Sequence, residues 1–150
     1  MIRFLLALVL LSACTRTASA PDPRPSMPLQ LRWEGNTLRE AAELAVTAWN
    51  EAMGCEVFAW GDRYPVTVWH GPLPGWSHST AGIGAAWSHV TVRSDTVFPE
   101  RVFAHELGHL LGLDHSPAAD SVMLSWPMTY RPNAADRDAA RASLRERGLL

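Results

Sequence analysis

The decisive stretch of the sequence is His105-Glu106-Leu107-Gly108-His109-Leu110-Leu111-Gly112-Leu113-Asp114-His115. On an α-helix, residues four apart lie one turn above each other, with about 5–6 Å between their Cβ atoms. The imidazoles of His105 and His109 can therefore approach one metal ion at Zn–N distances of about 2.0 Å. His115 cannot reach that ion from the same helix face, so the chain must turn back first. Gly112 allows the turn, because glycine adopts positive φ without a Cβ clash.

This spacing also indicates what the site does chemically. Three neutral imidazoles leave one coordination position of a Zn²⁺ ion open, which is the arrangement of catalytic zinc. A water molecule there becomes acidic enough to react near neutral pH. Glu106 follows the first ligand directly and is expected to project beside the metal, where its carboxylate takes a proton from that water. We therefore predict one catalytic Zn²⁺ ion, three histidine ligands and one general base.

The pattern is specific enough to suggest a family. At the frequencies of this composition, chance would produce all of these offsets about once in 10,000 chains or less. The run resembles the zinc signature of the metzincin metallopeptidases, His-Glu-x-x-His-x-x-Gly-x-x-His. It is most similar to that of the matrixins, which favour glycine at the position of Gly108 and serine at the position of Ser116.

The resemblance carries implications for fold and site. It implies an α+β, metzincin-like (zincin) catalytic domain with a small twisted mixed sheet, an active-site helix and a C-terminal helix. It also implies a methionine turn beneath the metal, for which Met123 is the candidate. Pro127 and Tyr130 look like counterparts of the family's pocket wall, although their spacing from Met123 is looser than in the matrixins.

The remaining patterns agree with an α+β order of elements. Strands are expected at residues 29–33, 66–69, 82–87 and 89–93. The glycines of 82–87 favour an edge strand, along which an extended substrate would pair. Helices are expected from a capping box at Thr37–Glu40 to Gly54, from Pro99 to Leu111, and from Asn133, with Asp136 three residues on, to Gly148. Cys55 is expected to be a small buried residue.

The first 28 residues are predicted to lie outside the folded domain. Residues 1–13 read as a lipoprotein-type signal peptide, because a single basic residue precedes an apolar run far shorter than the roughly 20 residues of a membrane span. Leu11-Ser12-Ala13-Cys14 resembles a bacterial lipobox, which implies lipidation of Cys14. Residues 14–28 are rich in proline and are predicted to form a tether. The metallopeptidase domain would then span 29–150.

Composition limits the choice of partners. The 150 residues are 47% hydrophobic and 19% charged, as expected for one folded domain. The 13 basic and 15 acidic residues leave a net charge of −2 without a basic cluster, so no nucleic-acid partner is expected. We expect a monomer that acts on polypeptides and is attached to a membrane through a lipid on Cys14.

The sequence predicts an exported zinc metalloendopeptidase, with Glu106 as the base that activates the metal-bound water. The protein would be a lipoprotein of the bacterial cell envelope, or secreted if the lipobox is not used. The same residues are also compatible with two other functions. One is a zinc-binding envelope lipoprotein without turnover, and the other is a zinc amidase that acts on cell-wall bonds.

Overall fold

The computed structural model describes residues 27–69, 79–84 and 87–150. Within them, the elements follow the order β1 (Leu29–Trp33), α1 (Arg39–Met53), β2 (Phe58–Trp60), β3 (Tyr64–Trp69), β4 (Ser79–Gly84), β5 (Trp87–Arg93), α2 (Pro99–Leu110) and α3 (Ala134–Glu146). The strands form one sheet in the order β2-β1-β3-β5-β4. All neighbours pair in parallel except β4, which runs antiparallel to β5 at the edge. The predicted α+β class with a small mixed sheet is confirmed.

The sheet is built from strands that bury one face. In β1, Leu29 and Leu31 are buried while the intervening Gln30 is exposed, which confirms the alternation expected from the sequence. The same core contains valines of the central strands, namely Val66, Val68, Val90 and Val92. The buried face of the sheet therefore provides an apolar surface on which helices can pack.

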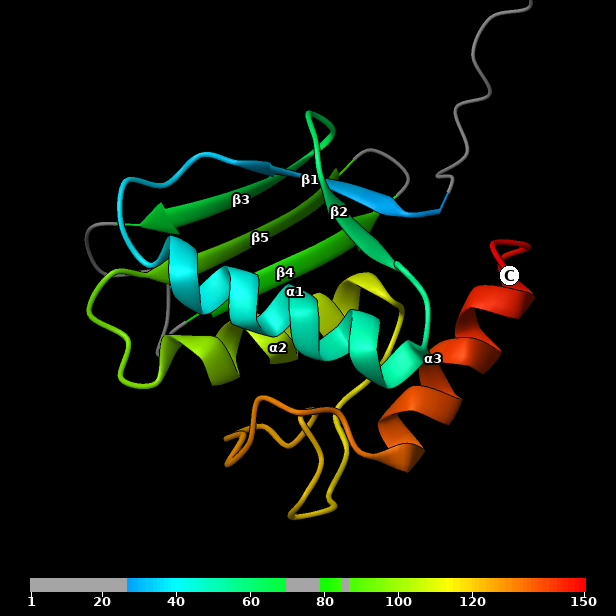
Figure 1. The fold of residues 1–150 in the computed structure, drawn as a ribbon. Helices are drawn as coiled ribbons and strands as arrows, with labels where there is room; N and C mark the ends of the chain where they lie inside the picture. The colour runs from blue at the N-terminus through cyan, green and yellow to red at the C-terminus, as the bar shows by residue number, and fades with distance from the viewer. Residues whose placement is uncertain (1–26, 70–78, 85–86) are drawn as a thin grey trace, which may run out of the picture.

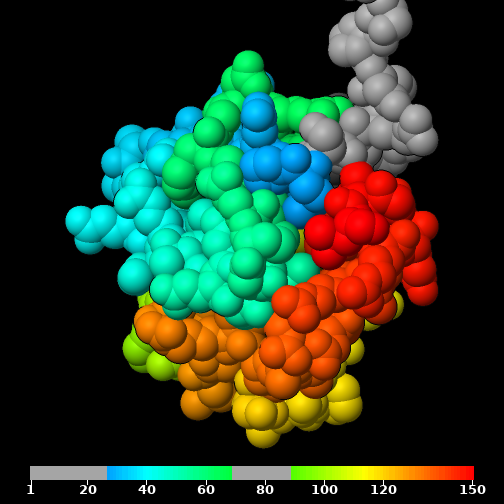
Figure 2. All heavy atoms as spheres, turned by 45° about the vertical axis from the view of Figure 1, so that its right-hand side comes forward, coloured from blue at the N-terminus to red at the C-terminus, as the bar shows by residue number. Residues whose placement is uncertain are grey.

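Helices α1 and α2 lie side by side on the same side of the sheet (Figure 1). Trp49 of α1 is fully buried, and its Nε1 atom donates a hydrogen bond of 2.8 Å to the carbonyl oxygen of Ala104 in α2. Helix α3 packs against α1, as the space-filling view shows in orange and red (Figure 2). Arg141 of α3 donates to the carbonyl oxygen of Met53 at the end of α1, at 2.8 Å. The position of α2 is thus fixed by α1, which α3 holds in turn.

The ends of the helices test the predicted caps. The capping box of α3 is confirmed, since Asn133 Oδ1 accepts from the amide of Asp136 at 2.9 Å and Asp136 Oδ2 accepts from the amide of Asn133 at 3.1 Å. The capping box predicted at Thr37 is wrong. The N-cap of α1 is Leu38, at φ 63° and with no side-chain cap bond. Leu38 packs against the core, and its burial starts the helix one residue later than a Thr37 cap requires.

One strand was missed, and two further expectations are corrected. Strand β2 was not predicted, because three residues are too few to show an alternating pattern. The edge strand is Ser79–Gly84 rather than 82–87, and Trp87 already belongs to β5. Cys55 is exposed rather than buried, because it lies just beyond the helix stop at Gly54 and before the chain turns inward at Val57.

The predicted signal peptide, the lipobox with Cys14, and nearly all of the tether lie outside the described residues. Among the residues that the structure describes, none of the helices is both long enough and apolar enough to cross a membrane.

Candidate metal centre

Three histidine side chains converge at the C-terminal end of α2. His105 and His109 lie one turn apart on the helix, and His115 returns to them from the following loop. The Nε2 atom of His105 lies 3.2 Å from the Nε2 atom of His109 and 3.2 Å from that of His115. His105 is buried, His109 is half-buried and His115 is exposed. The cluster is therefore open to solvent on one side.

Gly112 provides the turn that brings His115 back, as predicted. Its φ is 88°, and its amide donates to the carbonyl oxygen of His109 at 2.9 Å. A Cβ atom at this position would lie 2.3 Å from Oγ of Ser143 on α3. Glycine is required here both by the backbone conformation and by the close approach of α3.

Each of the three rings is held through its other nitrogen. The Nδ1 atom of His105 lies 2.8 Å from the carbonyl oxygen of Val122, and that of His109 lies 2.7 Å from the carbonyl oxygen of Leu113. The Nδ1 atom of His115 lies 3.4 Å from Oγ of Ser125. Sequence reasoning did not find these supports. Backbone carbonyls have no residue signature, and Ser125 stands ten residues beyond His115.

The donor set fits a tetrahedral zinc ion. Zn–N bonds of about 2.0 Å at tetrahedral angles separate two ligand nitrogens by about 3.3 Å, which is close to the 3.2 Å observed here. Carbonyl oxygens can only accept hydrogen bonds, so the Nδ1 atoms of His105 and His109 carry the protons and their Nε2 atoms carry lone pairs. Two lone pairs facing each other repel unless a cation lies between them. The cluster is therefore suited to a divalent cation.

The environment of His105 keeps its imidazole neutral. The pKa of His105 is lowered from 6.5 to about 4, mainly because burial disfavours the charged imidazolium, while the hydrogen bond to Val122 opposes the shift and the neighbouring His109 and His115 add to it. A neutral imidazole is the form that binds a metal. At neutral pH the buried residue of the cluster is therefore ready to act as a ligand.

The predicted base and the predicted methionine are both buried near the histidines, the first as a neighbour in the chain and the second through packing. Glu106 is buried in α2, next to His105 in the chain. Met123 is also buried and packs against α2 at Gly108, where an added Cβ atom would lie 2.2 Å from the Met123 sulfur and 3.2 Å from the Trp49 ring. The glycine just before His109 thus leaves the room that Met123 occupies.

The other predicted site residues follow Met123 in an irregular segment. Pro127 and Tyr130 are half-buried, and Tyr130 packs against the edge of the core. Trp126 and Met128, between them, are 71% and 68% exposed. Large apolar side chains therefore stand at the surface just beyond Met123.

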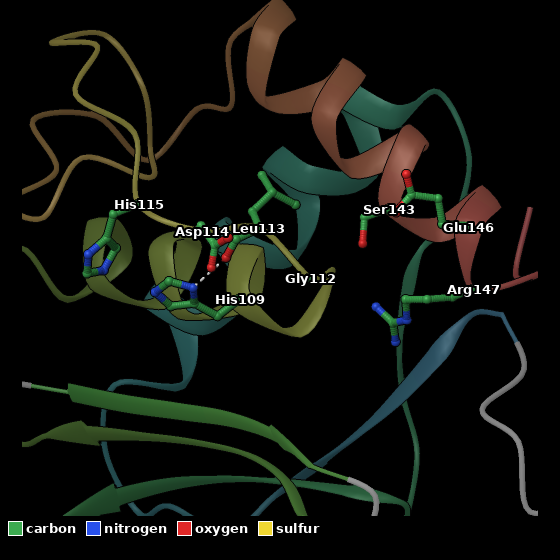
Figure 3. Close-up of a pocket in the computed structure, with 8 residues that line it drawn as sticks. All are labelled: His109, Gly112, Leu113, Asp114, His115, Ser143, Glu146 and Arg147. Atoms are coloured by element: carbon green, nitrogen blue, oxygen red, sulfur yellow. Dashed lines mark hydrogen bonds between the residues drawn. The ribbon is translucent and has the colours of Figure 1, made fainter.

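An open hollow of about 640 Å³ lies beside the histidine cluster. Figure 3 shows His109 and His115 toward one end, with Ser143 and Glu146 of α3 and the capping residue Arg147 at the other. Arg147 Nη1 donates to the carbonyl oxygen of Leu110, near the end of α2, at 3.2 Å. The solvent side of the cluster thus continues into a space between the loop and α3.

Fold and site together define a class. The α+β domain carries two histidines four residues apart on one helix and a third on the next loop, which fits a metzincin-like fold. Residues 73–141 match the family model described as Matrixin. The match covers a little under half of the chain, including α2, the histidine cluster and Met123. The chain carries a matrixin-type segment, and the resemblance to this family is confirmed. No curated protein matches the chain.

The lowered pKa of His105 predicts how the stability of the metal-free protein depends on pH. Between pH 4 and 6.5 the unfolded chain binds a proton that the folded chain does not, so stability rises with pH in this range and levels off above it. From this histidine we expect a loss of about 2 kcal/mol in the free energy of unfolding between pH 7 and pH 5. Urea denaturation in the presence of a chelator measures it.

His105→Gln is the matched variant, because it removes this titration. Between pH 7 and pH 5, the free energy of unfolding of this variant should fall by about 2 kcal/mol less than that of the natural sequence. An equal pH dependence in both proteins would contradict the assignment to His105.

The contact between Gly108 and Met123 predicts the effect of a single methyl group. Gly108→Ala should destabilise the metal-free protein by about 1–3 kcal/mol, because the clash with the buried sulfur outweighs the gain of roughly 1 kcal/mol in helix propensity. In a Met123→Ala background the same substitution should be neutral or stabilising. Urea denaturation of the four proteins measures both effects. An equal loss of stability in both backgrounds would show that the contact is not responsible.

Proposed function

We propose that this protein is a zinc-dependent metalloendopeptidase. The observation that carries the proposal is the convergence of three Nε2 atoms, two pairs of them 3.2 Å apart, in a cluster that is open to solvent on the His115 side. The match of residues 73–141, which include the three histidines, to the matrixin family model also supports a zinc peptidase. His105, His109 and His115 would hold the ion, and the open side would admit water and substrate.

A zinc ion held by these residues would supply an acidified water molecule and a positive charge for the oxyanion that develops on the scissile carbonyl. Glu106 would accept a proton from the attacking water on its carboxylate and donate it to the nitrogen of the leaving amine. Its burial in α2 beside His105 supports this role, because a carboxylate on the ligand-bearing helix needs little reorganisation to act there.

Other residues would position the substrate and the metal site. Strand β4 lies at the edge of the described sheet, where an extended polypeptide would pair with its backbone. Pro127 and Tyr130 would line a pocket for one substrate side chain, and Met123 would form the methionine turn. The burial of Met123 against Gly108 supports the last assignment.

We further propose that the protein is exported and acts as a monomer at the cell envelope. Cys14 would carry the lipid, residues 14–28 would form the tether and residues 29–150 the peptidase domain. The proposal rests on the lipobox-like residues 11–14 and on the proline-rich segment after them.

The general-base role of Glu106 predicts a separation of binding from catalysis. Glu106→Ala should still bind one zinc ion per chain but lose at least 100-fold in kcat/KM on a peptide library, because proton transfer contributes about 10²–10⁴-fold. Glu100→Ala is the matched control, since Glu100 lies in the first turn of the same helix. Its kcat/KM should match that of the natural sequence. Unchanged cleavage by Glu106→Ala would exclude the assigned base.

A second digestion assay distinguishes the endopeptidase from a cell-wall amidase and from a zinc-binding protein without turnover. Casein and peptidoglycan are digested side by side, with and without a zinc chelator. Cleavage of casein that the chelator abolishes supports the endopeptidase. Cleavage of peptidoglycan alone would support a cell-wall amidase, and zinc binding without turnover of either substrate would support a binding lipoprotein.

The envelope location predicts a particular mature N-terminus. Mass spectrometry of the protein from bacterial membranes should find Cys14 as the first residue, with two or three acyl chains. The variant Cys14→Ser should leave the membrane fraction. An unmodified cleaved end in the natural sequence would contradict the lipid anchor and favour secretion.

A further inference from the structure

A chain of hydrogen bonds joins His105 to a buried carboxylate on α3. Nδ1 of His105 donates to the carbonyl oxygen of Val122 at 2.8 Å. The amide N–H of the same peptide group, which belongs to Met123, donates to Oγ of Ser121 at 2.9 Å. The hydroxyl of Ser121 donates to Oδ1 of Asp136 at 2.5 Å. We call this chain the Ser121–Asp136 relay.

The direction of every bond in the relay is determined. A carboxylate can only accept, so the Ser121 hydroxyl proton points toward Asp136 and the Ser121 oxygen is left to accept from Met123. The peptide group between Val122 and Met123 then carries its dipole in the same sense. Aligned hydrogen bonds polarise one another, so each bond strengthens the next. The negative charge of Asp136 therefore acts on the Nδ1–H proton of His105 through bonded groups.

The relay is buried along its whole length. Ser121, Asp136 and His105 are 1%, 4% and 6% exposed. Asp136 is also fixed from a second side, because its Oδ2 atom accepts from the amides of Val122 at 3.0 Å and Asn133 at 3.1 Å. Water screens such a fixed, buried charge much less than a charge at the surface.

The other two histidines are supported differently. His109 is held by the carbonyl oxygen of Leu113, and His115 by the exposed Ser125. The relay therefore distinguishes His105 from His109, although both rings have a backbone carbonyl as their partner.

We propose that Ser121 and Asp136 are positioning residues of the metal centre, which orient the His105 ring and strengthen Nε2 of His105 as a ligand for a divalent cation. Hydrogen bonding at one imidazole nitrogen raises the basicity of the other, and loss of such outer partners typically costs 10–100-fold in metal affinity. The inference rests on the proposed zinc site. It extends that site from α2 and the following loop, which carry the histidines, to helix α3.

The first test measures zinc affinity by competition with a chromophoric chelator, on the full chain. Ser121→Ala and Asp136→Asn should each weaken zinc binding by about 10–100-fold. Asp138→Asn makes the same change of charge two residues along α3, at an exposed position paired with Arg137. Ala140→Gly destabilises α3 from a buried position outside the relay. Both controls should change the affinity by less than about threefold, and Ser121→Thr, which keeps the hydroxyl, should restore most of it.

The second test follows the Nδ1–H protons of the zinc-loaded protein by NMR. In Ser121→Ala and Asp136→Asn the His105 proton signal should move upfield, because its hydrogen bond weakens. The His109 signal should stay in place, since its partner Leu113 lies outside the relay. This readout does not depend on catalysis, and a general loss of packing would move both signals.

The outcomes separate the relay from the proposed function. Unchanged zinc affinity and an unmoved His105 signal in both variants would overturn the relay while leaving the peptidase proposal intact. Weakened binding that Ala140→Gly reproduces in full would also overturn it. Zinc binding that depends on the relay, in a protein that cleaves no peptide, would support the relay and reject the peptidase. Absence of zinc binding by the natural sequence would overturn both.

Discussion

Three imidazole Nε2 atoms converge on one small space, and at least two of them, those of His105 and His109, present lone pairs to it. Two facing lone pairs repel unless a cation lies between them, so the protein must hold the rings of His105 and His109 against that repulsion. The Nδ1 atoms of His105 and His109 are tied to backbone carbonyls at 2.8 and 2.7 Å, which leaves neither ring free to rotate away. His115 is held less closely and is the exposed member. The cluster is therefore firm on its buried side and accessible on the other.

The elements around the cluster explain how the rings are held in place. The Trp49 indole joins α1 to α2 through the carbonyl oxygen of Ala104, one residue before the first histidine of the cluster. Met123 fills the space left by Gly108, and Ser143 of α3 closes on Gly112. Each contact lies within one or two residues of a histidine or at the turn between two of them. The helix that carries the cluster is thus braced by α1, the loop containing Met123 and α3.

Much of the site could be predicted, because its chemistry requires particular residue types at fixed spacings. The four-residue interval between His105 and His109 predicted a shared helix face, and Gly112 predicted the turn, which the structure confirms at φ 88°. The supports of the site could not be predicted in the same way. Val122 and Leu113 contribute carbonyl oxygens that any residue would have. Asp136 was recognised as a capping residue, but its contact with Ser121 requires the fold.

The fold shows the same division. Segments with a clear periodic pattern, such as strand β1 and helix α1, were predicted. Strand β2 was missed because it has only three residues. Thr37 has the chemistry of a helix cap, yet the packing of Leu38 against the core decided where α1 begins. Cysteine is a residue type that is often buried, but Cys55 is exposed in the loop between α1 and β2. Local propensity was overruled in the last two cases by the tertiary position of the residue or its neighbour.

Zinc-edge X-ray absorption spectroscopy of the full chain, loaded with one equivalent of zinc, tests the central claim most directly. We expect three imidazole nitrogens at about 2.0 Å and one further oxygen from solvent. A first shell with two imidazoles or fewer, with a sulfur ligand, or with a fourth protein side chain in place of the solvent oxygen would contradict it.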